Sequence, residues 1–91
     1  MLSNLTSEVE LLKRHVMILK LVRENEPIGI LKLSELSKIP QHRVRYSLRI
    51  LEQKGIIKPS SKGAVSTKKA AKAMQSLPKE LKSISKKLRE I

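Results

Sequence analysis

Residues 41–54 hold a dense set of side chains that can donate hydrogen bonds. They are Gln41, His42, Arg43, Arg45, Tyr46 and Arg49. The arginine side chain presents a planar fork of N–H groups that fits phosphates and flat acceptor edges, and glutamine offers a donor beside an acceptor. No nucleophile stands beside a supporting base here. The chemistry indicated is recognition by hydrogen bonds and charge, without making or breaking bonds.

The remainder of the chain argues against catalysis and cofactor binding. It has no glycine-rich phosphate loop, no Ser/His/Asp set in a supporting context, and no cysteine. Its two histidines, without cysteines or a spaced acidic cluster, make no metal site. We therefore expect a protein that is not an enzyme, with no cofactor, no metal and no evident small-molecule ligand.

An apolar stripe predicts that residues 41–54 form a helix. Val44, Leu48 and Leu51 recur at i, i+4 and i+7, so they should be buried together. The donors listed above, and with them Ser47, are then expected to face solvent. Gly55 follows at the position where a helix end favours a left-handed residue.

The flanking segments predict a compact arrangement around this helix. Residues 30–37 read as a short helix with Leu33 and Leu36 facing inward, and Ile39 and Pro40 as the turn that follows it. Residues 56–58 and 64–66 have strand character, and residues 59–63 have turn composition. Thr67 is suited to cap a further helix over 68–76.

Both ends of the chain carry apolar helical stripes. In the first, Ser7 and Glu10 fit a capping box at the helix start, and Pro27 should end the helix. The second is a short seam in a helix over about 79–90, after Pro78. The seams either join two chains in a homodimer or close on each other within one chain. The dimerisation candidates are Leu5, Leu12, Leu77, Leu81, Ile84 and Leu88.

The distribution of charge indicates a polyanionic partner. The chain carries a net charge of +12. Residues 1–36 are neutral overall, whereas residues 37–63 and 64–91 each carry a net charge of +6. A neutral front half and a cationic back half favour a surface that faces nucleic acid.

These elements and residues resemble a known family. The order helix, helix, turn, helix, hairpin, helix is similar to that of winged helix-turn-helix domains, and Ser34, Lys38 and Val44 stand at the motif's spacing. Serine replaces the usual alanine and lysine the usual glycine, so Lys38 should adopt a left-handed conformation or the turn should be reshaped. The run VRYSLRILEQKGIIKP resembles the recognition helix and first wing strand of small bacterial and archaeal transcriptional regulators. The resemblance covers about residues 7–76.

The resemblance implies a mainly α fold with a small β-hairpin wing, a winged helix-turn-helix, plus a C-terminal helix after Pro78. Residues 1–76 would form the DNA-binding domain and residues 77–91 a helix for dimerisation or for packing on the first helix. The function implied is that of a sequence-specific regulator of transcription that binds double-stranded DNA. Arg45 and Gln41 are the best candidates for base contacts, and the wing lysines for backbone contacts. The expected DNA-contacting residues are Lys38, Gln41, His42, Arg43, Arg45, Tyr46, Arg49, Lys58, Ser60, Ser61 and Lys62.

Two other functions remain open at this point. An architectural or chromatin-type protein would bind DNA with little sequence preference, which the basic residues 64–91 favour. A winged helix that binds only proteins is a second alternative, which the cationic helix argues against. RNA is a weaker candidate, because stacking aromatic residues are missing. Without a signal peptide or a long apolar run, the chain is expected in the cytoplasm on the nucleoid, with no membrane partner.

Overall fold

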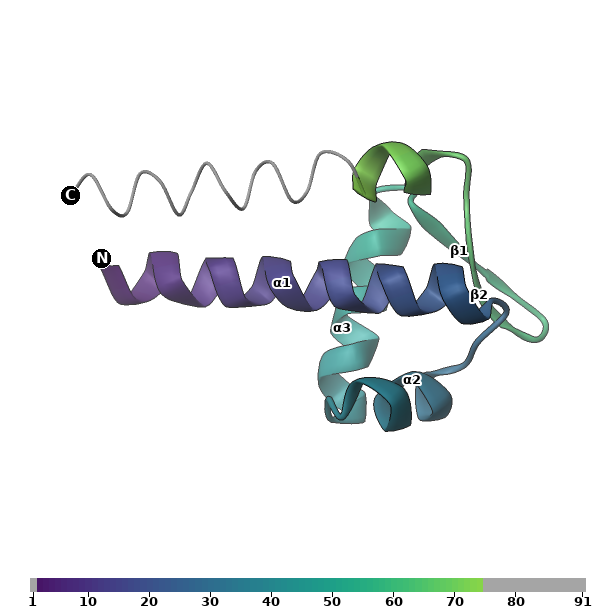
Figure 1. Cartoon of the computed structure of the whole chain (residues 1–91), viewed down its shortest axis with the longest axis horizontal. Helices are drawn as coiled ribbons and strands as arrows, with labels where there is room; N and C mark the ends of the chain where they lie inside the picture. The colour runs from purple at the N-terminus through teal and green to yellow at the C-terminus, as the bar shows by residue number, and fades with distance from the viewer. Residues whose placement is uncertain (1, 75–91) are drawn as a thin grey trace.

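The computed structural model describes residues 2–74 and, among these, the side chains of residues 7–74. Three helices are followed by an antiparallel hairpin and a short helix over 69–74 (Figure 1). The elements are α1 (Leu2–Asn25), α2 (Ile30–Ser37), α3 (Gln41–Gln53), β1 (Ile57–Ser60) and β2 (Gly63–Ser66).

The core lies where α1 crosses α3. Figure 1 shows α1 passing across α3 near its middle, with α2 near one end of α3 and the hairpin to one side. Every described element contributes aliphatic side chains, and burial of such side chains is the main stabilising contribution. The buried cluster consists of Ile18, Leu19, Val22, Ile28, Leu33, Val44, Leu48, Leu51, Ile56, Ile57, Ala64 and Ala70.

The first helix starts earlier than its sequence pattern predicts. Ser7 was expected to cap the helix, but α1 begins at Leu2, so that prediction is wrong. A capping box marks a start only when the residues before it leave helical geometry, and no glycine or proline precedes Ser7. Within the helix, Glu10 forms an ion pair with Lys13 at 3.6 Å instead. The other end is as predicted, since α1 stops at Asn25, two residues before Pro27.

The turn between α2 and α3 depends on serine side chains. Of the two alternatives for this turn, the structure has the left-handed Lys38, with φ of 61°. The hydroxyl of Ser34 donates to the carbonyl oxygen of Ile39 at 2.6 Å. The N–H of Ile39 in turn donates to the hydroxyl of Ser37 at 3.1 Å. Serine at the usual alanine position therefore stabilises the turn, because its hydroxyl satisfies a backbone carbonyl.

The second helix buries less than its sequence predicts. Leu33 is fully buried, but Leu36 is 43% exposed, so the prediction that both face inward is wrong. An eight-residue helix presents one narrow stripe to the core. Leu36 lies beside that stripe and faces an open groove between α1 and α2.

The hairpin has longer strands and a tighter turn than predicted. Ile57 pairs with Ser66 and Ser60 with Gly63, leaving only residues 61 and 62 in the turn. Pro59 lies within β1, opposite Ala64. The N–H of Ala64 donates to the carbonyl oxygen of Ile28 at 2.7 Å, and its carbonyl oxygen accepts from the N–H of Ile28 at 3.1 Å. Pro59 is tolerated because its partner makes its backbone hydrogen bonds on the other side.

Two predicted end signals around the hairpin are confirmed. Gly55 follows α3 with φ of 73°, the left-handed conformation. Thr67 accepts a hydrogen bond from the N–H of Lys69 at 3.3 Å at the start of the helix over 69–74. Its hydroxyl also donates to the carbonyl oxygen of Gly55 at 2.6 Å, so one side chain connects the ends of two helices.

Several predictions lie outside the described residues. They concern the helix after Pro78 and the end of the preceding one at Ser76. The side chains concerned are those of Leu5, Leu77, Leu81, Ile84 and Leu88. Leu12, the remaining dimerisation candidate, is half-buried on α1.

Candidate nucleic-acid interface

The buried side of α3 contains one residue that the sequence pattern assigned to solvent. Val44, Leu48 and Leu51 are buried as predicted, but Ser47 is also fully buried. Its hydroxyl oxygen lies 2.8 Å from Nδ1 of His15 on α1. The expectation that Ser47 faces solvent is wrong, because a buried histidine satisfies its hydroxyl.

The other predicted donors of α3 are all exposed. Tyr46 is 43% exposed, and its ring centroid lies 6.0 Å from that of His15 in a tilted arrangement. It is therefore partly packed on α1 while its edge reaches solvent. The exposed donors that α3 brings together are Gln41, His42, Arg43, Arg45, Tyr46 and Arg49.

Helical periodicity divides these donors into stripes with different neighbours. Leu48 and Glu52 line a depression together with Pro59, Ser60 and Gly63 of the hairpin. Gln41 and Arg45 lie along the same side of α3 as Leu48 and Glu52, so this stripe faces the side of the hairpin. A second stripe is exposed and comprises His42, Tyr46, Arg49 and Gln53, with Tyr46 also packed beside His15.

The hairpin places further cations beside α3. Lys58, Ser61 and Lys62 are exposed at and near its tip. Ser60 is exposed as well, but its hydroxyl donates to the carbonyl oxygen of Gly63 at 2.5 Å and accepts from the N–H of Lys62 at 3.3 Å. Ser60 thus has a role in forming the turn. Lys38 is exposed in the turn that leads into α3.

Comparison with known proteins gives this arrangement a family. A family model described as winged helix-turn-helix DNA-binding matches residues 11–58, which is more than half of the chain. The chain belongs to this winged helix-turn-helix family. A comparison with curated proteins finds no significant match.

The family assignment identifies the elements by role. The match extends from within α1 through α2 and the whole of α3 into β1. In this winged helix, α3 is the recognition helix and the β1–β2 hairpin is the wing. The family binds DNA and is typically non-enzymatic.

The arginines of the recognition helix take part in no ion pair among the described residues. Within residues 7–74, the ion pairs of the structure are Lys13 with Glu10 and Lys32 with Glu35, on α1 and α2. The recognition helix also begins without a side-chain cap and without an acidic residue in its first turn. An uncapped helix start presents N–H groups and a positive partial charge, which favour an anion.

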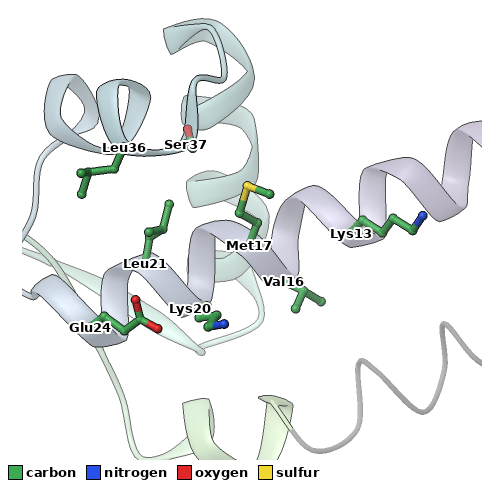
Figure 2. Close-up of a pocket in the computed structure, with 8 residues that line it drawn as sticks. All are labelled: Lys13, Val16, Met17, Lys20, Leu21, Glu24, Leu36 and Ser37. Atoms are coloured by element: carbon green, nitrogen blue, oxygen red, sulfur yellow. The ribbon is translucent and has the colours of Figure 1, made fainter.

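A groove between α1 and α2 is a separate feature. Figure 2 shows Leu36 and Ser37 of α2 facing Met17 and Leu21 of α1 across a groove of about 470 Å³. None of its lining residues belongs to the recognition helix or the wing. In the part of the chain that the structure describes, no group of histidine and carboxylate side chains could hold a metal ion. No described helix is long and apolar enough to cross a membrane.

Proposed function

We propose that this protein is a sequence-specific regulator of transcription, with the recognition helix in the major groove of double-stranded DNA and the wing on the backbone. One observation carries the proposal. The recognition helix presents Arg43, Arg45 and Arg49 on an exposed face, outside any ion pair among the described residues. An α-helix with its side chains is about as wide as the major groove, which it enters side-on in proteins of this kind.

The first half of the recognition helix supplies the side chains suited to reading bases. Arginine pairs with O6 and N7 of guanine, and glutamine with N6 and N7 of adenine. Arg45 and Gln41 are assigned these contacts, because both are exposed and both lie on the stripe beside the wing. Arg49 and His42, on the second stripe, reach bases or phosphates of the same groove.

The remaining cations act on the DNA backbone. Lys58 and Lys62 of the wing and Lys38 of the turn are exposed, flexible point charges. Contacts of this kind fix the position of the protein and raise affinity, but they carry little sequence information.

The proposal includes a homodimer that acts in the cytoplasm on the nucleoid. Residues 1–76 form the DNA-binding domain, and the seam of residues 77–91 joins two chains together with Leu5 and Leu12 of α1. The apolar period of these segments supports this arrangement. Two half-sites about one helical turn apart follow from it. Light scattering at micromolar concentration tests the claim, and a monomeric mass contradicts it.

Selection of bound sequences from a random duplex library at about 150 mM salt tests specificity. Wild type, Arg45→Ala and Lys20→Ala are compared. Lys20 is the matched control because it is an exposed cation in the groove between α1 and α2. We expect wild type and Lys20→Ala to enrich one motif that Arg45→Ala loses or relaxes.

The same selection separates the alternative function. The net charge of +6 over residues 64–91 favours an architectural protein that binds any sequence. Binding by wild type without enrichment, with a steep dependence on salt, is the result that this alternative requires. Absence of binding even at low salt contradicts both functions.

A further inference from the structure

The exposed face of the recognition helix is bounded by two long edges, and the wing lies beside only one of them. The opposite edge faces α1, which crosses α3 in Figure 1. Periodicity places four residues on this edge at i, i+4, i+7 and i+11. They are Arg43, Ser47, Ile50 and Lys54. The hydrogen bond between Ser47 and His15 shows that this edge lies against α1.

Two cations that the sequence pattern did not assign lie along this second edge. Lys54 is exposed directly after the recognition helix, and its N–H donates to the carbonyl oxygen of Ile50 at 3.1 Å. Arg14 precedes His15 on α1 and lines a shallow depression together with Ile39, next to the start of the recognition helix. The two cations therefore stand near opposite ends of the same edge.

The electrostatic environment of His15 agrees with this placement. Burial lowers the pKa of His15 below its ordinary value, and the positive charges of Arg14 and Lys54 lower it further. Both cations are thus close enough to act on a side chain that contacts the recognition helix. Neither takes part in the ion pairs of the described residues, so their charges remain available to an outside anion.

The geometry of DNA gives these charges a target. A recognition helix with its side chains is roughly 10–12 Å wide and fills a major groove of about 12 Å, so a phosphate strand runs along each of its edges. The wing lysines serve the strand on one side. We propose that Arg14, Arg43 and Lys54 form a second phosphate-binding edge, which contacts the DNA strand on the side away from the wing. This inference rests on the proposed function.

The experiment measures how DNA affinity depends on salt. Wild type, Arg14→Gln, Lys54→Gln and the double variant are titrated onto a mixed-sequence duplex of about 30 base pairs between about 50 and 300 mM salt. Each lost phosphate contact lowers the slope of log K against log salt by about 0.9, so the double variant should lose about 1.8. Lys20→Gln removes the same charge from α1 on the groove side and should keep the wild-type slope.

Two further variants guard against loss of structure. Arg14→Lys and Lys54→Arg keep the charge and should keep the slope, whereas a folding defect would lower the thermal midpoint measured by circular dichroism. If both glutamine variants keep the wild-type slope of log K against log salt, the proposed second edge is wrong. If Arg49→Gln still weakens DNA binding in the same experiment, the proposed function is retained. No binding by wild type at about 50 mM salt overturns both.

Discussion

Nδ1 of His15 lies 2.8 Å from Oγ of Ser47, and this hydrogen bond joins α1 to the recognition helix across 32 positions of sequence. His15 is 8% exposed and Ser47 is fully buried. Every buried side-chain nitrogen and oxygen among the described residues has a hydrogen-bond partner. This buried polar contact therefore adds to the apolar packing of Val44, Leu48 and Leu51, which orients the recognition helix.

Removing the hydroxyl of this pair should destabilise the protein. Ser47→Ala leaves Nδ1 of His15 buried without a partner, which costs about 1–3 kcal/mol in the free energy of unfolding. Urea unfolding followed by circular dichroism measures the change. Ser61→Ala, at the exposed tip of the wing, is the matched control and should stay within about 0.5 kcal/mol of wild type. Equal stability of the two variants would contradict the role of the hydrogen bond.

His15 should also make stability depend on pH. Its pKa in the folded protein is lowered from the ordinary 6.5 by burial, and then by Arg14 and Lys54. Between these two pKa values the unfolded chain binds more protons than the folded protein. The free energy of unfolding therefore falls as pH decreases through 6.5 toward the pKa of His15 in the folded protein. Above this window the contribution of His15 is complete.

Urea unfolding at several pH values, with His15→Gln as comparator, isolates this effect. The difference in unfolding free energy should change across the window below 6.5. Parallel pH curves for the two proteins would show that His15 does not titrate differently on folding.

The tight approach of the wing to Ile28 predicts a large effect at Gly63. Its φ is 132°, and a Cβ there would lie 2.5 Å from the carbonyl carbon of Ile28, a backbone atom that cannot turn aside. Gly63→Ala should therefore lower the free energy of unfolding by at least about 3 kcal/mol. Gly29→Ala is the matched control. A Cβ at Gly29 meets no atom within 4 Å, and its φ of −92° suits any residue.

Chemical denaturation of the two alanine variants checks this prediction. Gly29→Ala should stay within about 1 kcal/mol of wild type, because restriction of the unfolded chain opposes the loss of a favoured residue at the N-cap of α2. Similar stabilities of the two variants would show that the hairpin can move away from Ile28 at little cost.

Glu26 connects the end of α1 to the base of the wing in a pH-dependent way. The carboxylate of Glu26 accepts two hydrogen bonds from Ser66, one from the hydroxyl at 2.6 Å and one from the backbone N–H at 3.1 Å. These bonds, followed by the charge of Arg23, lower the pKa of Glu26 below its ordinary 4.5. The contact is therefore present above 4.5 and is lost as pH falls through the lower, folded pKa. The amide signal of Ser66 in NMR spectra should follow that titration, and Glu26→Gln should abolish the transition.

Regular patterns made most of the fold predictable from sequence. The spacing of Val44, Leu48 and Leu51 predicted the recognition helix and its buried stripe, and the structure has both. Residues with special backbone demands were equally informative. Lys38 and Gly55 stand at helix ends that require positive φ, and both adopt it. Such signals are local, so one sequence is enough to read them.

Apart from the local capping signal at Ser7, the wrong side-chain predictions concern contacts between distant segments. Ser47 looks like a solvent-facing residue on its own helix, and only its meeting with His15, 32 residues away, explains its burial. Leu36 looks like core, but its exposure depends on how α2 lies against α1. The assignment of individual DNA contacts stays a prediction, because reach toward a duplex depends on the position of the duplex as well as on exposure.

The pairing of Ile28 with Ala64 adds a third segment of backbone to the two-stranded wing. The wing is thereby anchored to the residues that lead into α2, and its separation from the recognition helix is set by the fold. A duplex that meets both must present its major groove and the neighbouring backbone at that one separation. DNA sequences differ in the energy needed to bend or twist into a given shape. Base pairs that no side chain touches would then contribute to the choice of site, through the stiffness of the DNA between the two contacts.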